Sequence, residues 1–184
     1  EGGHGGPSVR GAGLEGPAGD QLLRVRGGLG RLGGGDDGAE AAFGACAERY
    51  GVDEVNFTFD GPSLGRHRGV RVLSREELQS GDVSLEYVSR LMNRRYSEAA
   101  TIRRVLQTLW YQVNSGQEIY VMGAILPDRT VRGGTGWGAE FAKLCNKPLC
   151  VFDQEQDAWF KWEDGDWTRL TAASALVITH PHFT

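Results

Sequence analysis

The feature that most constrains the fold is a strand, a helix and a second strand that follow one another within residues 119–153. Ile119–Met122 is a short apolar run typical of a buried strand, residues 135–145 have a helical pattern, and Leu149–Phe152 is a second apolar run that ends at Asp153. Two strands joined by a helix within roughly 35 residues are typical of a parallel crossover unit. The sequence therefore predicts an α/β protein with an open, mostly parallel sheet and flanking helices.

Helical patterns, strand patterns and turn signals alternate through the rest of the chain. Ser74 and Glu77 form a capping box, which predicts a helix start, and Asp164-Gly165 is a hairpin turn signal between two aromatic segments. We therefore expect a single domain with one aromatic β-hairpin. Helices are expected at 38–50, from about 75 onward and at 102–113, and strands at 55–59, 159–162, 167–170 and 176–179.

Glycine is concentrated near the N-terminus, where half of the chain's 28 glycines fall within residues 1–35. A segment so rich in glycine and so poor in apolar residues cannot offset the entropy lost on ordering its backbone. We expect residues 1–32 to form a disordered leader and residues 33–184 to form the folded domain. Because the chain begins with Glu1 rather than Met and stops soon after an apolar run, this domain is expected to be truncated at its C-terminus.

Charge and hydropathy exclude several classes of partner. A net charge of −4 and a pI near 5.6 argue against binding to duplex nucleic acid, which depends on a concentrated basic surface. Neither a membrane-spanning run nor a secretory signal is visible, so we expect a soluble cytoplasmic protein without a membrane partner. The three cysteines form no CxxC pair and are expected to be reduced, and the sequence calls for no metal and no cofactor.

The segment Arg132–Glu140 is the strongest candidate for a ligand site. It places Gly133, Gly134, Thr135 and Gly136 between a predicted strand and a predicted helix. Glycines allow backbone amides to approach an anion closely, and the start of a helix adds free N–H groups and a partial positive charge. Phosphate binding is one interpretation of this turn, and a simple tight turn is the other. Asp153, at the end of the next strand, is expected near the rim of the same site.

Glu140 carries the second chemical signal of this segment. A carboxylate near a bound phosphate could accept ribose hydroxyls or stabilise positive charge that develops on a sugar carbon. It does not sit at the capping-box position, which with Thr135 as N-cap would be Gly138. The structural alternative is a solvated helix glutamate, and the residue type alone does not decide between the two.

These residues carry a resemblance to a known family. Gly133-Gly134-Thr135-Gly136 followed by Glu140 resembles the GGxGTxxE signature of the LOG phosphoribohydrolases, and residues 33–40 are similar to the SGGAxGxD turn of SLOG and DprA-related domains. The resemblance implies a Rossmann-like domain that binds a nucleotide or nucleotide-derived ligand. It also implies that Gly34, Gly35 and Asp37 contribute to binding and that Glu140 is the catalytic residue.

The chain departs from the LOG pattern at two points. Nine residues, 124–132, separate the predicted strand from the glycine motif, which in LOG enzymes follows its strand almost directly. The Arg-Lys pair of LOG enzymes is replaced by Gln107-Thr108, so the candidate cationic partners are Arg103 and Arg104, about one turn earlier, and Arg132.

Two functions from different classes follow from this pattern. The first is a sensor or accessory domain that binds a nucleotide-like small molecule through the glycine-rich turn. The alternative is a LOG-like phosphoribohydrolase that cleaves the N-glycosidic bond of a nucleoside monophosphate, which requires a basic residue facing Glu140. The sequence leaves open whether the chain is an enzyme and whether it forms a homodimer.

Overall fold

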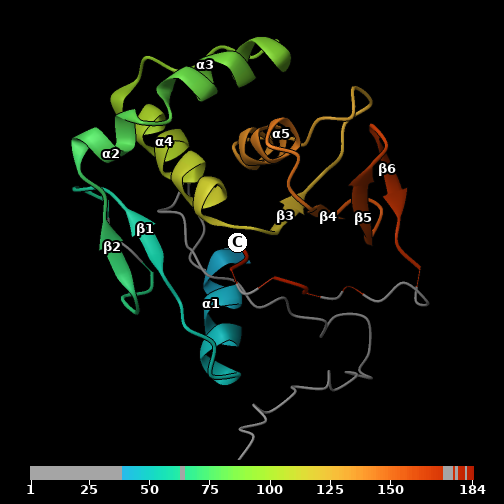
Figure 1. The fold of residues 1–184 in the computed structure, drawn as a ribbon, viewed down its shortest axis with the longest axis horizontal. Helices are drawn as coiled ribbons and strands as arrows, with labels where there is room; N and C mark the ends of the chain where they lie inside the picture. Colours follow the sequence, from blue (N-terminus) through green and yellow to red (C-terminus); the bar gives the residue numbers. More distant parts are fainter. Residues whose placement is uncertain (1–38, 63–64, 172–175, 177, 181) are drawn as a thin grey trace, which may run out of the picture.

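The computed structural model describes residues 39–184 apart from 63–64, 172–175, 177 and 181. The predicted leader, 1–32, and the candidate ligand residues Gly34, Gly35 and Asp37 lie outside the described residues. The described elements, in chain order, are α1 (Ala39–Arg49), β1 (Asn56–Thr58), β2 (Val70–Val72), α2 (Arg75–Gln79), α3 (Asp82–Leu91), α4 (Ala100–Ser115), β3 (Ile119–Gly123), α5 (Thr135–Leu144), β4 (Leu149–Asp153), β5 (Ala158–Glu163) and β6 (Asp166–Arg169) (Figure 1).

The predicted crossover unit and the predicted hairpin are both present. β3 and β4 pair in parallel, with Ile119 opposite Leu149, and α5 connects them. β5 and β6 pair antiparallel around Asp164 and Gly165, both of which have positive φ angles. The local signals were sufficient here because a tight turn and a short crossover are determined by residues close in sequence. The α/β class is thus confirmed.

The main sheet is less parallel than the sequence predicts. Its strand order is β3-β4-β5-β6, and β5 runs antiparallel to β4 as well as to β6. The turn between β4 and β5 spans only 154–157, which is too short for the crossover that a parallel pair needs. β1 pairs in parallel with β2, a strand that the sequence did not predict, and this pair forms a separate sheet.

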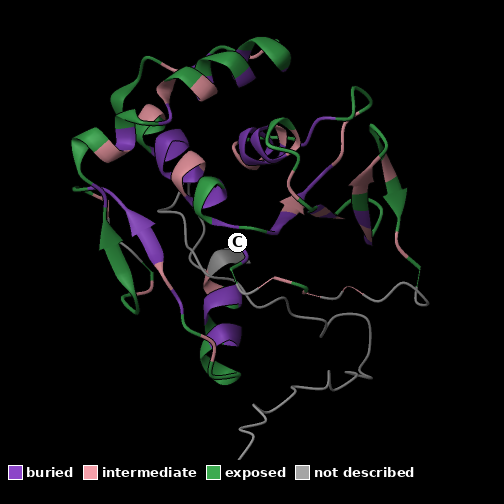
Figure 2. Ribbon diagram, in the orientation of Figure 1, coloured by how far each residue is buried: buried purple, intermediate pink, exposed green. Residues whose placement is uncertain are grey.

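Both faces of the β3–β4 pair are covered, one by α4 and α5 and the other by α1 and the residues around Phe183. Ile119 and Val121 of β3 belong to the core beneath α4 and α5, whereas Tyr120 on the opposite face packs with Phe43 of α1 and with Phe183. This alternation follows the two-residue period of a strand. α4 lies between the two sheets and contacts α5 on one side and β1 on the other (Figure 1). Buried residues line the surfaces of these elements that face one another (Figure 2).

The strand predicted at 176–179 is absent among its described residues. The buried carboxylate of Glu118 instead accepts hydrogen bonds from the backbone amides of Thr179 and His180, at 2.9 and 3.2 Å. These amides are therefore bound to a side chain rather than to a neighbouring strand. Further along the chain, Phe183 forms an isolated parallel bridge with Glu118, the residue that precedes β3.

No helix in the described part of the chain combines the length and the apolar character needed to cross a membrane.

Candidate functional site

The loop between β3 and α5 folds back on itself and delivers the glycine-rich turn to the end of β3. Ile125 and Val131 form an isolated antiparallel bridge, and the amide of Arg132 donates to the carbonyl of Ala124 at 2.9 Å. The residues that separate the strand from the glycine motif therefore form a loop whose two ends are hydrogen-bonded to each other. After it, the chain resumes next to the carboxyl end of β3, which is where ligands of α/β sheets bind.

The turn itself exposes backbone donors at the start of α5. Gly133 has a φ of +77°, a left-handed conformation that favours glycine. Gly134 is the N-cap and provides no side-chain cap. Among the described residues, none accepts a hydrogen bond from the amides of Gly134, Thr135 or Gly136. Unpaired amides at a helix start, together with the helix dipole, favour an anion at this position.

Thr135 and Gly123 bring the end of β3 and the start of α5 into contact. A Cβ atom added to Gly123 would lie 2.7 Å from Cγ1 of Val131 and 3.6 Å from Oγ1 of Thr135. The Thr135 hydroxyl donates to the carbonyl of Arg132 at 3.3 Å, a long hydrogen bond. The hydroxyl can therefore exchange this partner for a ligand oxygen at little cost.

Gly136 has a packing role. A Cβ atom at this position would lie 2.0 Å from the carbonyl oxygen of Val131 and 2.9 Å from Nη1 of Arg94. Because the nearest atom belongs to the backbone, the clash cannot be relieved by a side-chain rotation. Gly136 allows α5 to begin directly against the folded-back loop, and any contribution to a ligand comes from its amide.

Arg94, which is not among the site residues predicted from the sequence, holds the loop from the other side. Its guanidinium donates to the carbonyl of Val131 at 3.0 Å and to the hydroxyl of Thr130 at 2.7 Å. Asp128 in turn accepts hydrogen bonds from the amide and the hydroxyl of Thr130. Arg94 lies 36 residues or more from these partners in the sequence, so no local pattern could have identified it.

Asp153 is at the end of β4, as predicted, but its carboxylate is occupied by the protein. It is 1% exposed and accepts hydrogen bonds from the amides of Ile125, Glu155 and Gln156 and from the side chain of Gln156. Burial alone would raise the pKa of this carboxyl, but the hydrogen bonds outweigh burial and hold the pKa below its ordinary value. Asp153 therefore organises the turn after β4 and anchors the loop after β3.

Arg132 is the candidate cationic partner that lies at the turn. Its side chain is 61% exposed and forms an ion pair of 2.6 Å with Glu155, which is 58% exposed. Exposed ion pairs of this kind contribute about 0–1 kcal/mol, so an anionic ligand can compete with Glu155 for the guanidinium.

Glu140 pairs with a lysine that lies against the β5–β6 hairpin rather than with the candidate arginines. It forms an ion pair of 2.6 Å with Lys143, and both side chains are nearly buried. The Lys143 ammonium lies 3.8 Å from the ring centroid of Trp162 and also donates to the carbonyl of Arg129 at 2.8 Å. Burial lowers the pKa of Lys143, and Glu140 opposes this effect. The i, i+3 spacing of Glu140 and Lys143 is a local signal for this ion pair.

Arg103 and Arg104 are on α4 and are engaged elsewhere. Arg103 forms an ion pair of 3.0 Å with Asp82 and lies 4.6 Å from the ring centroid of Tyr96. Arg104 lies over the ring of Phe59. Neither contacts Glu140 in the described part of the structure.

The hairpin tryptophans are packed, as expected for a cross-strand pair. Trp162 and Trp167 face each other across β5 and β6 with ring centroids 5.0 Å apart, and Trp159 packs against Phe152. None of the three cysteines forms a disulfide, and no group of three or more metal-ligating side chains comes together among the described residues.

Comparison of the chain with family models, with curated proteins and with solved structures found no match. The class of ligand is therefore inferred from the chemistry of the turn.

We expect Asp153→Asn to reduce the free energy of unfolding by about 1–3 kcal/mol at pH 7, because an amide cannot accept all four hydrogen bonds. Because the folded pKa is lowered, the contribution of Asp153 is present above its unfolded pKa and is lost as the pH falls through the folded value. The difference between variant and wild type, measured by urea unfolding, should shrink as the pH approaches about 3. Asp60→Asn, at an exposed site, is the control. A loss of unfolding free energy in Asp153→Asn that is as large at about pH 3 as at pH 7 would contradict this account.

Proposed function

We propose that the turn Arg132–Gly136 binds the phosphate of a nucleotide or nucleotide-derived ligand, and that the chain acts as a sensor or accessory domain. The observation that carries the proposal is the hydrogen bond from the Arg132 amide to the Ala124 carbonyl. It returns the turn to the end of β3 and leaves the amides of Gly134, Thr135 and Gly136 directed at no acceptor among the described residues. Backbone donors and one exposed arginine at a helix start suit a phosphate.

The surrounding layers support a Rossmann-like interpretation of this region. β3, α5 and β4 form a parallel crossover, and α1 packs on the face of β3 opposite α5. In doubly wound folds a phosphate is bound where the first turn of such a helix meets the strand end. The resemblance to the LOG and SLOG motifs is consistent with the same location.

Binding without hydrolysis is favoured by the surroundings of Glu140. Cleavage of an N-glycosidic bond needs a carboxylate that is free to stabilise a developing positive charge on the ribose. Here the charge of Glu140 is already compensated by Lys143 on the same helix, and the pair is packed beneath the hairpin. The alternative is a LOG-like phosphoribohydrolase, in which the ligand would have to displace Lys143 from Glu140.

The first test is Gly134→Val. Gly134 has φ −65° and ψ −40°, values that valine adopts, so the backbone should be retained, whereas a branched side chain at the N-cap should obstruct a phosphate that approaches the amides. Affinity for AMP, measured by calorimetry, should fall at least about tenfold, or ~1.4 kcal/mol. Gly65→Val, at an exposed glycine where an added Cβ would meet no described atom within 4 Å outside its chain neighbours, should leave affinity unchanged. Inorganic phosphate and adenosine as separate ligands identify which part of AMP is bound. Unchanged affinity in Gly134→Val would refute the phosphate site.

A pair of variants with opposite effects sharpens this test. Arg132→Gln removes the cation and should weaken AMP binding several-fold, whereas Glu155→Gln frees Arg132 from its partner and should strengthen it. Both variants break the same ion pair, so a loss of stability alone would move them in the same direction. Equal effects of the two variants would count against a role for Arg132 in binding.

A further prediction distinguishes the nucleotide-binding domain from the phosphoribohydrolase. We expect little or no release of free base when the chain is incubated with AMP or N6-substituted AMP, and only a modest change of affinity in Glu140→Gln. Chromatography of free base is the measurement. If the wild type turns over at about 1 per second or faster and Glu140→Gln abolishes this activity, the chain is a phosphoribohydrolase and the sensor proposal is wrong.

A further inference from the structure

α3 has an apolar stripe on its outer surface. Val83, Tyr87 and Leu91 are spaced by four residues, so they line up on one side of the helix, and their exposed fractions are 85%, 52% and 54%. The opposite side of α3 carries Leu85 and Val88, which belong to the core. α3 is thus apolar on both sides, and in Figure 2 its outer surface is largely exposed. A contiguous exposed stripe of this kind is typical of an interaction surface.

An open groove of about 450 Å³ lies beside the stripe. Its lining includes Val83 and Tyr87 of the stripe, together with Tyr96 and Arg103, which lie before and on α4. The polar groups on the α4 side of the groove are paired with one another: Asp82 accepts hydrogen bonds from the Tyr96 hydroxyl and the Gln107 amide, both at 2.7 Å, and forms the ion pair with Arg103. The lining also includes Glu86 and Arg90, which are exposed. Apart from Glu86 and Arg90, the groove therefore offers few free donors or acceptors, so it suits an apolar or aromatic side chain that lies next to a charged group.

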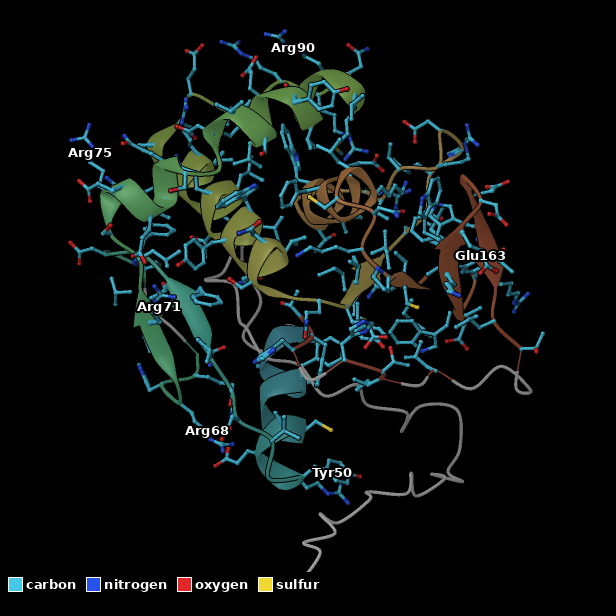
Figure 3. The ribbon with its side chains drawn as sticks, viewed as in Figure 1. Tyr50, Arg68, Arg71, Arg75, Arg90 and Glu163 are labelled. Carbon is cyan, nitrogen blue, oxygen red and sulfur yellow. The ribbon has the colours of Figure 1, made fainter. Side chains whose placement is uncertain are left out.

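The charges of α3 make this surface complementary to itself. Glu86 in the middle of the helix and Arg90 in its last turn flank the stripe on the same side, and Arg90 points outward from the helix (Figure 3). They form a weak i, i+4 ion pair of 3.5 Å, with side chains that are 53% and 76% exposed. When two copies of α3 are placed antiparallel about a two-fold axis, Glu86 of each copy faces Arg90 of the other, and the two stripes meet between them.

We propose that α3 is a homodimerisation surface, on which a second copy of this chain packs its own α3 antiparallel. Self-complementarity of charge is the reason to choose a second copy over an unrelated partner, because an isologous contact requires each surface to match itself. A contact centred on one helix pair lies at the small end of stable interfaces, so the dimer is expected to have a Kd in the micromolar range. The proposal is independent of the ligand site.

The experiment is sedimentation equilibrium of the full chain over about 1–500 µM, a range that brackets micromolar association. The wild type should shift from monomer to dimer. Glu86→Arg and Arg90→Glu each place like charges across the interface and should weaken dimerisation about tenfold or more. An equimolar mixture of the two variants should recover it, because one chain then carries two arginines at these positions and the other carries two glutamates.

The mixture distinguishes an interface from a change in helix stability. Both variants lose the same intrahelical ion pair, so a purely intramolecular role would affect each chain alone and could not be rescued by mixing. Leu91→Asp should abolish association, whereas Arg75→Glu on α2, a charge reversal away from the stripe, should leave it unchanged. A monomeric wild type at all concentrations overturns the proposal, as does a mixture that fails to recover the dimer. In the first case the stripe would have to serve a different protein.

Discussion

Arg94 ties the loop after β3 to the segment that follows α3, and the geometry of the candidate site depends on this attachment. Its guanidinium holds the carbonyl of Val131 and the hydroxyl of Thr130, and the same carbonyl lies against Gly136. On the opposite side the carbonyl of Arg129 accepts hydrogen bonds from Lys143 and from the indole of Trp167. The loop is therefore fixed by three separate parts of the chain, and a turn fixed in this way presents its free amides in advance of any ligand.

Most of the fold could be predicted because its elements are specified by residues close together in the sequence. The capping box of Ser74 and Glu77 forms as expected, and the apolar period of α4 and the turn at Asp164-Gly165 were sufficient to locate their elements. Two features could not be predicted locally. β2 has three exposed residues and exists only because β1 lies beside it, and residues near Thr179 look like a strand but bind Glu118, 61 residues away.

The position of the candidate site was predictable, but the roles of its residues were not. A glycine-rich turn at a helix start identifies where an anion could bind, and the structure brings Arg132 and Thr135 to that turn. Whether a carboxylate is available for chemistry depends on all of its neighbours, and some of those neighbours come from distant parts of the chain. Asp153 is occupied by amides of two turns, and Glu140 is compensated by Lys143 beneath the hairpin. The i, i+3 spacing indicates the Glu140–Lys143 pair, but residue type and spacing indicate neither the contact of Lys143 with Trp162 nor the hydrogen bond from Ile125 to Asp153.

The order of strands in the main sheet has a consequence for how the chain folds. β3, β4, β5 and β6 are neighbours in the same order in which they occur in the sequence, so every ladder of this sheet closes a short loop. Contacts between α1 and the residues near Phe183, in contrast, span almost the whole described chain. Because short loops lose less entropy on closing, we expect the crossover and the hairpin to form first and α1 to dock late. Hydrogen-exchange labelling during refolding would then protect the amides of β3–β6 before those of α1.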